Sequence, residues 1–283
     1  MILQNDELFV TISNTVFRHT RTGNRQFIFD PDALQGFFDG VNVKRTETTR
    51  PNQWGDFSEP GLLGARHITL TGAAVASSPE ELLSMRDEFT ALLSHGEYKE
   101  ISVQNSVQKR YITVALEGSP SWVQKIDTTA VWKLELYAPD PRMFGPQQSI
   151  QITDSTVSGG IDYPMNYPVN YGGGIKVMAV SMFNAGNTEA WPVFKVTGDF
   201  MQGFSITDGG DNKITYEGIV TMTAPVTIDT GAGTARQGGI DKSVNLSKRE
   251  WFNIPAGKSI QPLFLPKQDA AGWCDIMFRD TWI

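Results

Sequence analysis

The chain has 283 residues, of which 40% are hydrophobic and 19% charged, so it has enough apolar material for about two folded domains at roughly 150 residues each. Its formal net charge of −7 argues against a protein that binds nucleic-acid phosphates, because that class is normally basic. Its single cysteine, Cys274, excludes an intrachain disulfide, and no run approaches the ~18 apolar residues of a membrane helix, so we expect no membrane insertion.

The N-terminal half is predicted to be mostly strand. Asp6 and Glu7 stand where a signal peptide needs positive charge, so we expect the chain to fold in a reducing cytoplasm. Residues 48–65 contain Pro and Gly together with Trp54 and Phe57, and we expect a functional loop there, as long loops usually have a role. The two aromatic side chains either anchor a neighbouring subunit or fold back on their own domain. Alternating or β-branched runs predict strands over residues 41–47, 66–74, 110–117 and 130–137.

One helix is predicted after these first strands. Ser78 is a suitable capping residue, Pro79 suits the first helical position, and Glu81 completes a capping box. Apolar residues then recur at three- and four-residue steps from Leu82 to Leu92, with Leu83 and Leu93 widening the stripe. The following His95-Gly96 predicts the end of the helix, since glycine adopts the left-handed conformation readily.

The second half predicts a different domain. The prolines of residues 138–142 end the strand pattern, because proline cannot donate to a sheet ladder. Residues 148–172 are rich in Pro and Gly and predict an extended connector. Short strand-like runs and Gly-containing turns then alternate to the end of the chain, which indicates a β-sandwich over residues 173–283. The predicted fold class is therefore mainly β, with a β-barrel or sandwich carrying one α-helix over residues 1–147.

No residue pattern points to catalysis. The three histidines, His19, His67 and His95, lack zinc-site spacing, and no nucleophile elbow is present, so we expect no enzyme, cofactor or metal. Residues 208–212, Asp-Gly-Gly-Asp-Asn, match either a hairpin turn or a fragment of a calcium loop. Aromatic residues of the second half pack in the core or form a platform for stacking on a sugar ring; they are Trp251, Phe252, Trp273 and Trp282.

The ordered set of motifs along the chain resembles phage distal tail proteins. In the first half the similar segments are Arg66 to Gly72, the helix that begins at Pro79, and the Asp-Pro-Arg corner at residues 138–142. In the second half they are the Tyr-Pro repeat at 163–171, Asn184-Ala185-Gly186 with Trp191-Pro192, Ile228-Asp229-Thr230, residues 254–260, and residues 278–282. Lys258, Ser259 and Asp211-Asn212 depart from the family pattern at two turns.

This resemblance implies a structural protein of a long, flexible phage tail of the siphovirus type. Similar proteins form a hexameric ring with a tail-tube-like N-terminal β-barrel and an outward galectin-like, jelly-roll sandwich. The implied partners are the tail tube protein, the tail-tip or tail-associated protein and the tape measure protein. The resemblance also implies that genomic DNA passes through the lumen of the ring without specific binding. The implied location is the tail tip or baseplate of the virion, after assembly in the host cytoplasm.

Two other functions remain open from the sequence. One is a carbohydrate-binding adaptor that contacts the host surface, with Trp251 and Trp273 as the stacking residues. The other is a tail-tube protein proper, which has no need of the second domain. For the distal tail function, the candidate ring interface is Trp54 and Phe57.

Overall fold

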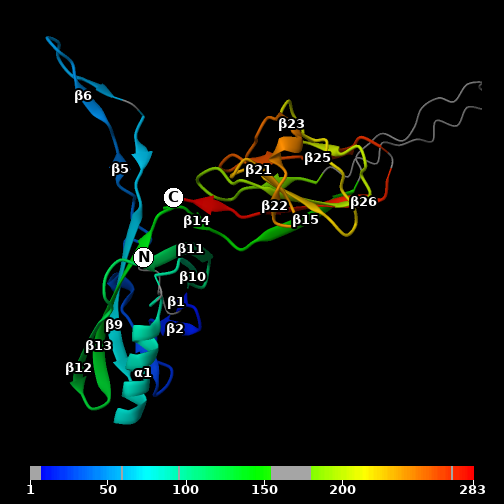
Figure 1. Cartoon of the computed structure of the whole chain (residues 1–283). Coiled ribbons are helices and arrows are strands. Elements are labelled where there is room, and N and C mark those ends of the chain that lie inside the picture. Colours follow the sequence, from blue (N-terminus) through cyan, green and yellow to red (C-terminus); the bar gives the residue numbers. More distant parts are fainter. Residues whose placement is uncertain (1–7, 59, 95, 154–179, 269) are drawn as a thin grey trace, which may run out of the picture. The chain divides into compact units, whose positions relative to one another are not determined.

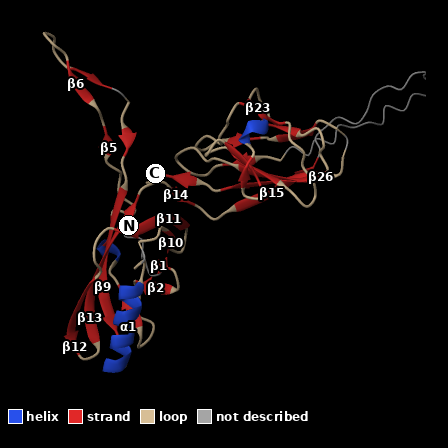
Figure 2. Cartoon of the chain, viewed as in Figure 1, coloured by secondary structure: helices blue, strands red, loops and turns tan. Residues whose placement is uncertain are grey.

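The computed structural model describes residues 8–58, 60–94, 96–153, 180–268 and 270–283 (Figure 1). The chain divides into two compact units, and the boundary along the chain falls between Pro146 and Gln147. Strands dominate both units (Figure 2), and α1 (Pro79–Ala91) is the one α-helix of the described ranges, so the prediction of a mainly β chain is confirmed. None of the helices described is long and apolar enough to cross a bilayer.

Seven strands of the first unit close into a barrel in the order β13-β9-β3-β2-β1-β10-β11, with β11 pairing back to β13. Neighbouring strands are antiparallel except for β2 and β3, which are parallel. The barrel strands are β1 (Phe9–Ile12), β2 (Thr15–Arg18), β3 (Gln26–Ile28), β9 (Arg66–Val75), β10 (Lys99–Gln104), β11 (Lys109–Leu116) and β13 (Thr129–Ala138). Shorter elements flank them: the 3-10 helix η1 (Pro31–Ala33), β4 (Leu34–Gln35), β12 (Ser121–Ile126) and β14 (Met143–Phe144).

The barrel interior and the helix share one apolar core. Along β13 every second residue is buried, as the alternating sequence predicts for a strand with one face inside. Helix α1 begins as predicted, with the Ser78 Oγ accepting a hydrogen bond of 3.2 Å from the Glu81 N–H. Its Phe89 ring packs 5.5 Å from Trp122 and 5.7 Å from Trp132 between ring centroids. Leu83 was expected to widen the buried stripe, but its side chain is exposed, because it points away from this core.

The structure corrects the predicted loop over residues 48–65. The chain folds back on itself there as a two-stranded antiparallel arm, which extends away from the barrel strands in Figure 1. The strand predicted over residues 41–47 covers the first run of the arm, but the returning runs at 56–58 and 62–63 are two or three residues long, too short to display an alternating period. Its strands are β5 (Val43–Lys44) paired with β8 (Leu62–Leu63), and β6 (Glu47–Thr49) paired with β7 (Asp56–Ser58).

The second unit is a sandwich of two main sheets around one core. The larger sheet has the order β15-β26-β17-β20-β21-β22 and the smaller has the order β23-β19-β18-β25. Phe194, Ile228 and Ile276 of the larger sheet belong to the same buried cluster as Ile214 and Phe264 of the smaller. The larger sheet contains β15 (Gln148–Thr153), β17 (Val193–Gly198), β20 (Val226–Asp229), β21 (Thr234–Gln237), β22 (Ile240–Asp241) and β26 (Gly272–Phe278).

The remaining elements of this unit complete the sandwich. They are β18 (Phe204–Thr207), β19 (Lys213–Tyr216), β23 (Leu246–Arg249) and β25 (Leu263–Pro266) of the smaller sheet, the pair β16 (Met182–Phe183) and β24 (Ser259–Ile260), and the 3-10 helix η2 (Ser243–Asn245). The last strand of the chain, β27 (Thr281–Trp282), belongs to neither sandwich sheet.

The predicted connector over residues 148–172 starts differently in the structure. Its first six residues form β15, which pairs with β26 along its whole length. The alternation of polar residues with Ile150 and Ile152 explains this strand, since it supplies one apolar face for the sandwich core. The rest of the predicted connector, including the Tyr-Pro repeat, lies outside the described residues.

Candidate functional site

The arm carries large apolar side chains that the described chain leaves mostly exposed. Trp54 lies in the turn between β6 and β7 and is 98% exposed. Phe57 of β7 is 59% exposed, and the Arg50 guanidinium lies 4.9 Å from its ring centroid. Leu62 at the base of the arm is 74% exposed. Large apolar groups exposed together in this way are typical of a surface that another chain covers.

The two predicted stacking residues do not lie together. Trp251 is half-buried, packs against the sandwich core, and adjoins Gly233 in the turn from β20 to β21. Trp273 lies opposite Thr197, near the C-terminal end of β17, whereas the β20–β21 turn lies at the N-terminal end of that strand. Four residues at ~3.3 Å each separate these positions by about 13 Å along the strand. Trp251 and Trp273 therefore do not form one platform.

The Asp208–Asn212 segment is the hairpin turn between β18 and β19. One Asp208 carboxylate oxygen accepts a 2.7 Å hydrogen bond from the Gly210 N–H, and the other accepts one of 2.7 Å from the Asn212 amide. Both oxygens thus have partners within the turn. In the described part of the chain, no three His, Cys, Asp or Glu residues gather as metal ligands.

Arg66 joins two of the segments that carry the family resemblance. It begins β9, is 2% exposed, and has no acidic side chain as a hydrogen-bond partner. Burial lowers the pKa of its guanidinium, and the nearby Asp39 carboxylate partly raises it again. Its guanidinium donates four hydrogen bonds of 2.6–3.1 Å to backbone oxygens, those of Gly36, Phe37, Asp39 and Pro141. The Arg66 and Asp-Pro-Arg motifs are thus parts of one structural cluster.

In the second unit, the buried Asn184 likewise joins segments that carry the family resemblance, through hydrogen bonds to their backbone groups. Its amide donates to the backbone oxygens of Thr188 and Ile254, at 2.7 and 3.0 Å. Its carbonyl oxygen accepts from the N–H groups of Gly186 and Thr281, at 2.9 and 3.3 Å. At Gly186 a Cβ atom would lie 1.9 Å from the Thr281 oxygen, so this close approach requires glycine. Three motif segments distant in sequence therefore meet at one buried, fully bonded amide.

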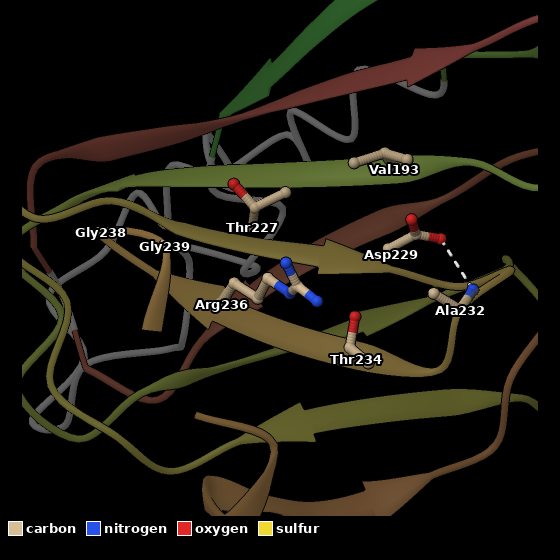
Figure 3. Close-up of a pocket in the computed structure, with 8 residues that line it drawn as sticks. All are labelled: Val193, Thr227, Asp229, Ala232, Thr234, Arg236, Gly238 and Gly239. Carbon is tan, nitrogen blue, oxygen red and sulfur yellow. Dashed lines mark hydrogen bonds between the residues drawn. The ribbon is translucent and has the colours of Figure 1, made fainter. Parts of the chain in front are cut away.

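The outward face of the larger sheet holds a hollow of about 450 Å³ (Figure 3). Its charged residues, Asp229 and Arg236, were not predicted as a site from the sequence. Alternation around Ile228 and Ala235 indicates that both face outward, but their adjacency depends on strand order and register. The hollow is lined by Val193, Thr227, Asp229, Ala232, Thr234, Arg236, Gly238 and Gly239.

No protein-family model and no curated protein sequence matches the chain. Among solved structures the chain is similar to the Dit protein of phage SPP1, described as a paradigm of the hub adsorption apparatus in phages that infect Gram-positive bacteria. The TM-score is 0.63 at 11% identity, over 98% of this chain and 99% of that chain. The chain has the fold of a phage Dit protein. This confirms the resemblance to distal tail proteins at the level of the fold.

The Dit fold also matches chains of the phage P2 baseplate in its activated conformation. The TM-score is 0.54 for the baseplate structure with calcium and 0.51 for the baseplate structure with strontium. Both matches cover 96% of this chain and 97% of that chain, at 11% identity. The similarity therefore extends over the barrel unit and the sandwich unit alike.

Proposed function

We propose that the chain is a structural protein of a phage tail, a distal tail protein at the tail tip. The observation that carries this proposal is the fold match to the SPP1 Dit protein over 98% of the chain, in both units. A tail-tube protein proper is the weaker alternative, because it has no need of the sandwich unit. The role assigned is architectural, without catalysis or a cofactor.

In this proposal the first unit forms a hexameric ring through head-to-tail contacts that close after six subunits. The exposed arm, with Trp54 and Phe57 as its aromatic anchors, docks on the neighbouring copy. The ring joins the tail tube protein to the tail-tip protein, next to the tape measure protein. The domain boundaries are those of the two compact units, each with its own core.

The proposal predicts a ring in the purified full chain. We expect a particle of about 188 kDa, six times the 31.3 kDa of one chain, by light scattering after size exclusion. Negative-stain images of the same fraction should show closed six-fold rings. A monomer that persists at micromolar concentration would contradict a self-closing ring, and a different rotational symmetry would contradict the hexamer.

We also predict that the ring does not retain duplex DNA. A hexamer of a chain with charge −7 carries a formal charge of −42, so an acidic or neutral lumen is readily built. A basic lumen would hold DNA through counterion release, since DNA carries one charge per ~1.7 Å. A mobility-shift assay at physiological salt and micromolar protein should show no complex. Binding that weakens steeply as salt is added would contradict the role of a conduit.

A further inference from the structure

The hollow on the outward face of the larger sandwich sheet is built from three neighbouring strands. Strand β17 contributes Val193, β20 contributes Thr227 and Asp229, and β21 contributes Thr234 and Arg236. In Figure 3 the Arg236 guanidinium is drawn among the side chains from β20 and β21. Ala232 and the glycines at 238 and 239 complete the lining from the turns next to these strands.

Strand register places these side chains opposite one another. Thr227 lies opposite Arg236, Asp229 lies opposite Thr234, and Val193 lies opposite Asp229. Opposed residues of an antiparallel pair have Cβ atoms about 5 Å apart, so the five side chains form one compact group. The intervening residues Phe194, Ile228 and Ala235 are fully buried in the core, so the sheet beneath the hollow is fixed by packing.

The polar groups of the hollow have unused hydrogen-bonding capacity. One Asp229 oxygen accepts a 2.9 Å hydrogen bond from the Ala232 N–H, which leaves the second oxygen available. Within the described residues, the Arg236 guanidinium and the hydroxyls of Thr227 and Thr234 make no hydrogen bond or salt bridge. Arg236 lies opposite Asp241 of β22, and its positive charge helps to lower the pKa of that carboxyl, so the guanidinium has a charged neighbour but keeps its hydrogen-bond donors for a ligand. The hollow therefore offers guanidinium donors, two hydroxyls and one carboxylate acceptor to a ligand.

This combination selects the chemistry of the ligand. An anion would face the carboxylate of Asp229, and a cation would face the guanidinium of Arg236. A neutral ligand with many hydroxyl groups satisfies both, because each hydroxyl donates one hydrogen bond and accepts others. Val193 and Ala232 add a small apolar surface for the C–H groups of a ring. We propose that the hollow binds a neutral saccharide unit, a function independent of ring assembly.

Saturation-transfer NMR on the full chain tests this site, with glucose, galactose and N-acetylglucosamine as neutral probes and glucuronic acid as the charged one. We expect at least one neutral probe to bind saturably, with millimolar affinity. Arg236→Ala should weaken that binding about tenfold or more, the effect of losing one hydrogen bond to a charged group. Asp229→Asn keeps the acceptor for the Ala232 N–H and should also weaken it.

Two control variants lie outside the hollow. Lys248→Ala changes an exposed cation on the other sheet, and Trp273→Ala removes the aromatic ring at the far end of β17; neither should change the affinity. The proposal is overturned if no neutral probe binds or if glucuronic acid alone binds. It is also overturned if Arg236→Ala binds as tightly as the wild type while Trp273→Ala does not.

Discussion

The Arg66→Met variant is expected to lose about 4 kcal/mol of the unfolding free energy of the first unit. Replacing a buried ion pair with apolar groups is often tolerated, but the partners of Arg66 are backbone oxygens, which no substitution removes. Four carbonyl groups, three from residues 36–39 and one from Pro141, would lose their donor. At about 2–4 °C per kcal/mol, the first unit should melt roughly 8–16 °C lower in a calorimetric scan.

A matched control separates this effect from the loss of any arginine. Arg86 lies on helix α1 with its side chain 47% exposed, next to Asp87, so Arg86→Met should cost less than about 0.5 kcal/mol. Arg66→Lys keeps the charge but has fewer donors in a different geometry, and it should fall between the two. Equal melting temperatures for the Met variants of Arg66 and Arg86 would show that the buried cluster does not stabilise the unit.

The features that the sequence predicted correctly are those encoded locally. Helix α1 has its cap, its first-turn proline and its apolar stripe within about fifteen residues, and β13 has a ten-residue alternation. In the arm only the outgoing run, over residues 41–47, has such a signal, because the returning runs are two or three residues long and follow an exposed turn. The hollow depends on strand order and register, which no local pattern reveals. The Asn184 cluster depends on hydrogen bonds to residues 70 and 97 positions away in the sequence.

Three residues of the motifs that carry the family resemblance are buried structural groups. Arg66, Asn184 and Gly186 hold backbone segments together, and none of them lies on the arm or in the hollow. Such groups identify a fold because their loss would leave buried polar atoms unpaired or force backbones apart. These three residues carry no information on partners, whereas Asp229 of the Ile228-Asp229-Thr230 motif lines the hollow.

Substitution at the arm tip is expected to abolish ring assembly without destabilising the chain. Trp54 and Phe57 are 98% and 59% exposed, so Trp54→Ser with Phe57→Ser should change the unfolding free energy by less than about 0.5 kcal/mol. An aromatic anchor at an interface contributes about 2 kcal/mol or more, and a closed ring of six contains six copies of the same contact. The loss per ring is therefore about 12 kcal/mol or more for a single anchor, and light scattering should detect monomer alone.

Val107→Ser is the matched control for the arm, since Val107 is an apolar residue of the first unit, 89% exposed in the turn between β10 and β11. This variant should assemble as the wild type does, because the turn lies outside the arm. Thermal scans of the double variant, of Val107→Ser and of the wild type should coincide when each is dilute enough to be monomeric, which would show that the change at the tip acts on assembly alone. A double variant that still elutes as a hexamer would place the ring interface elsewhere on the barrel and leave the arm free for another tail protein.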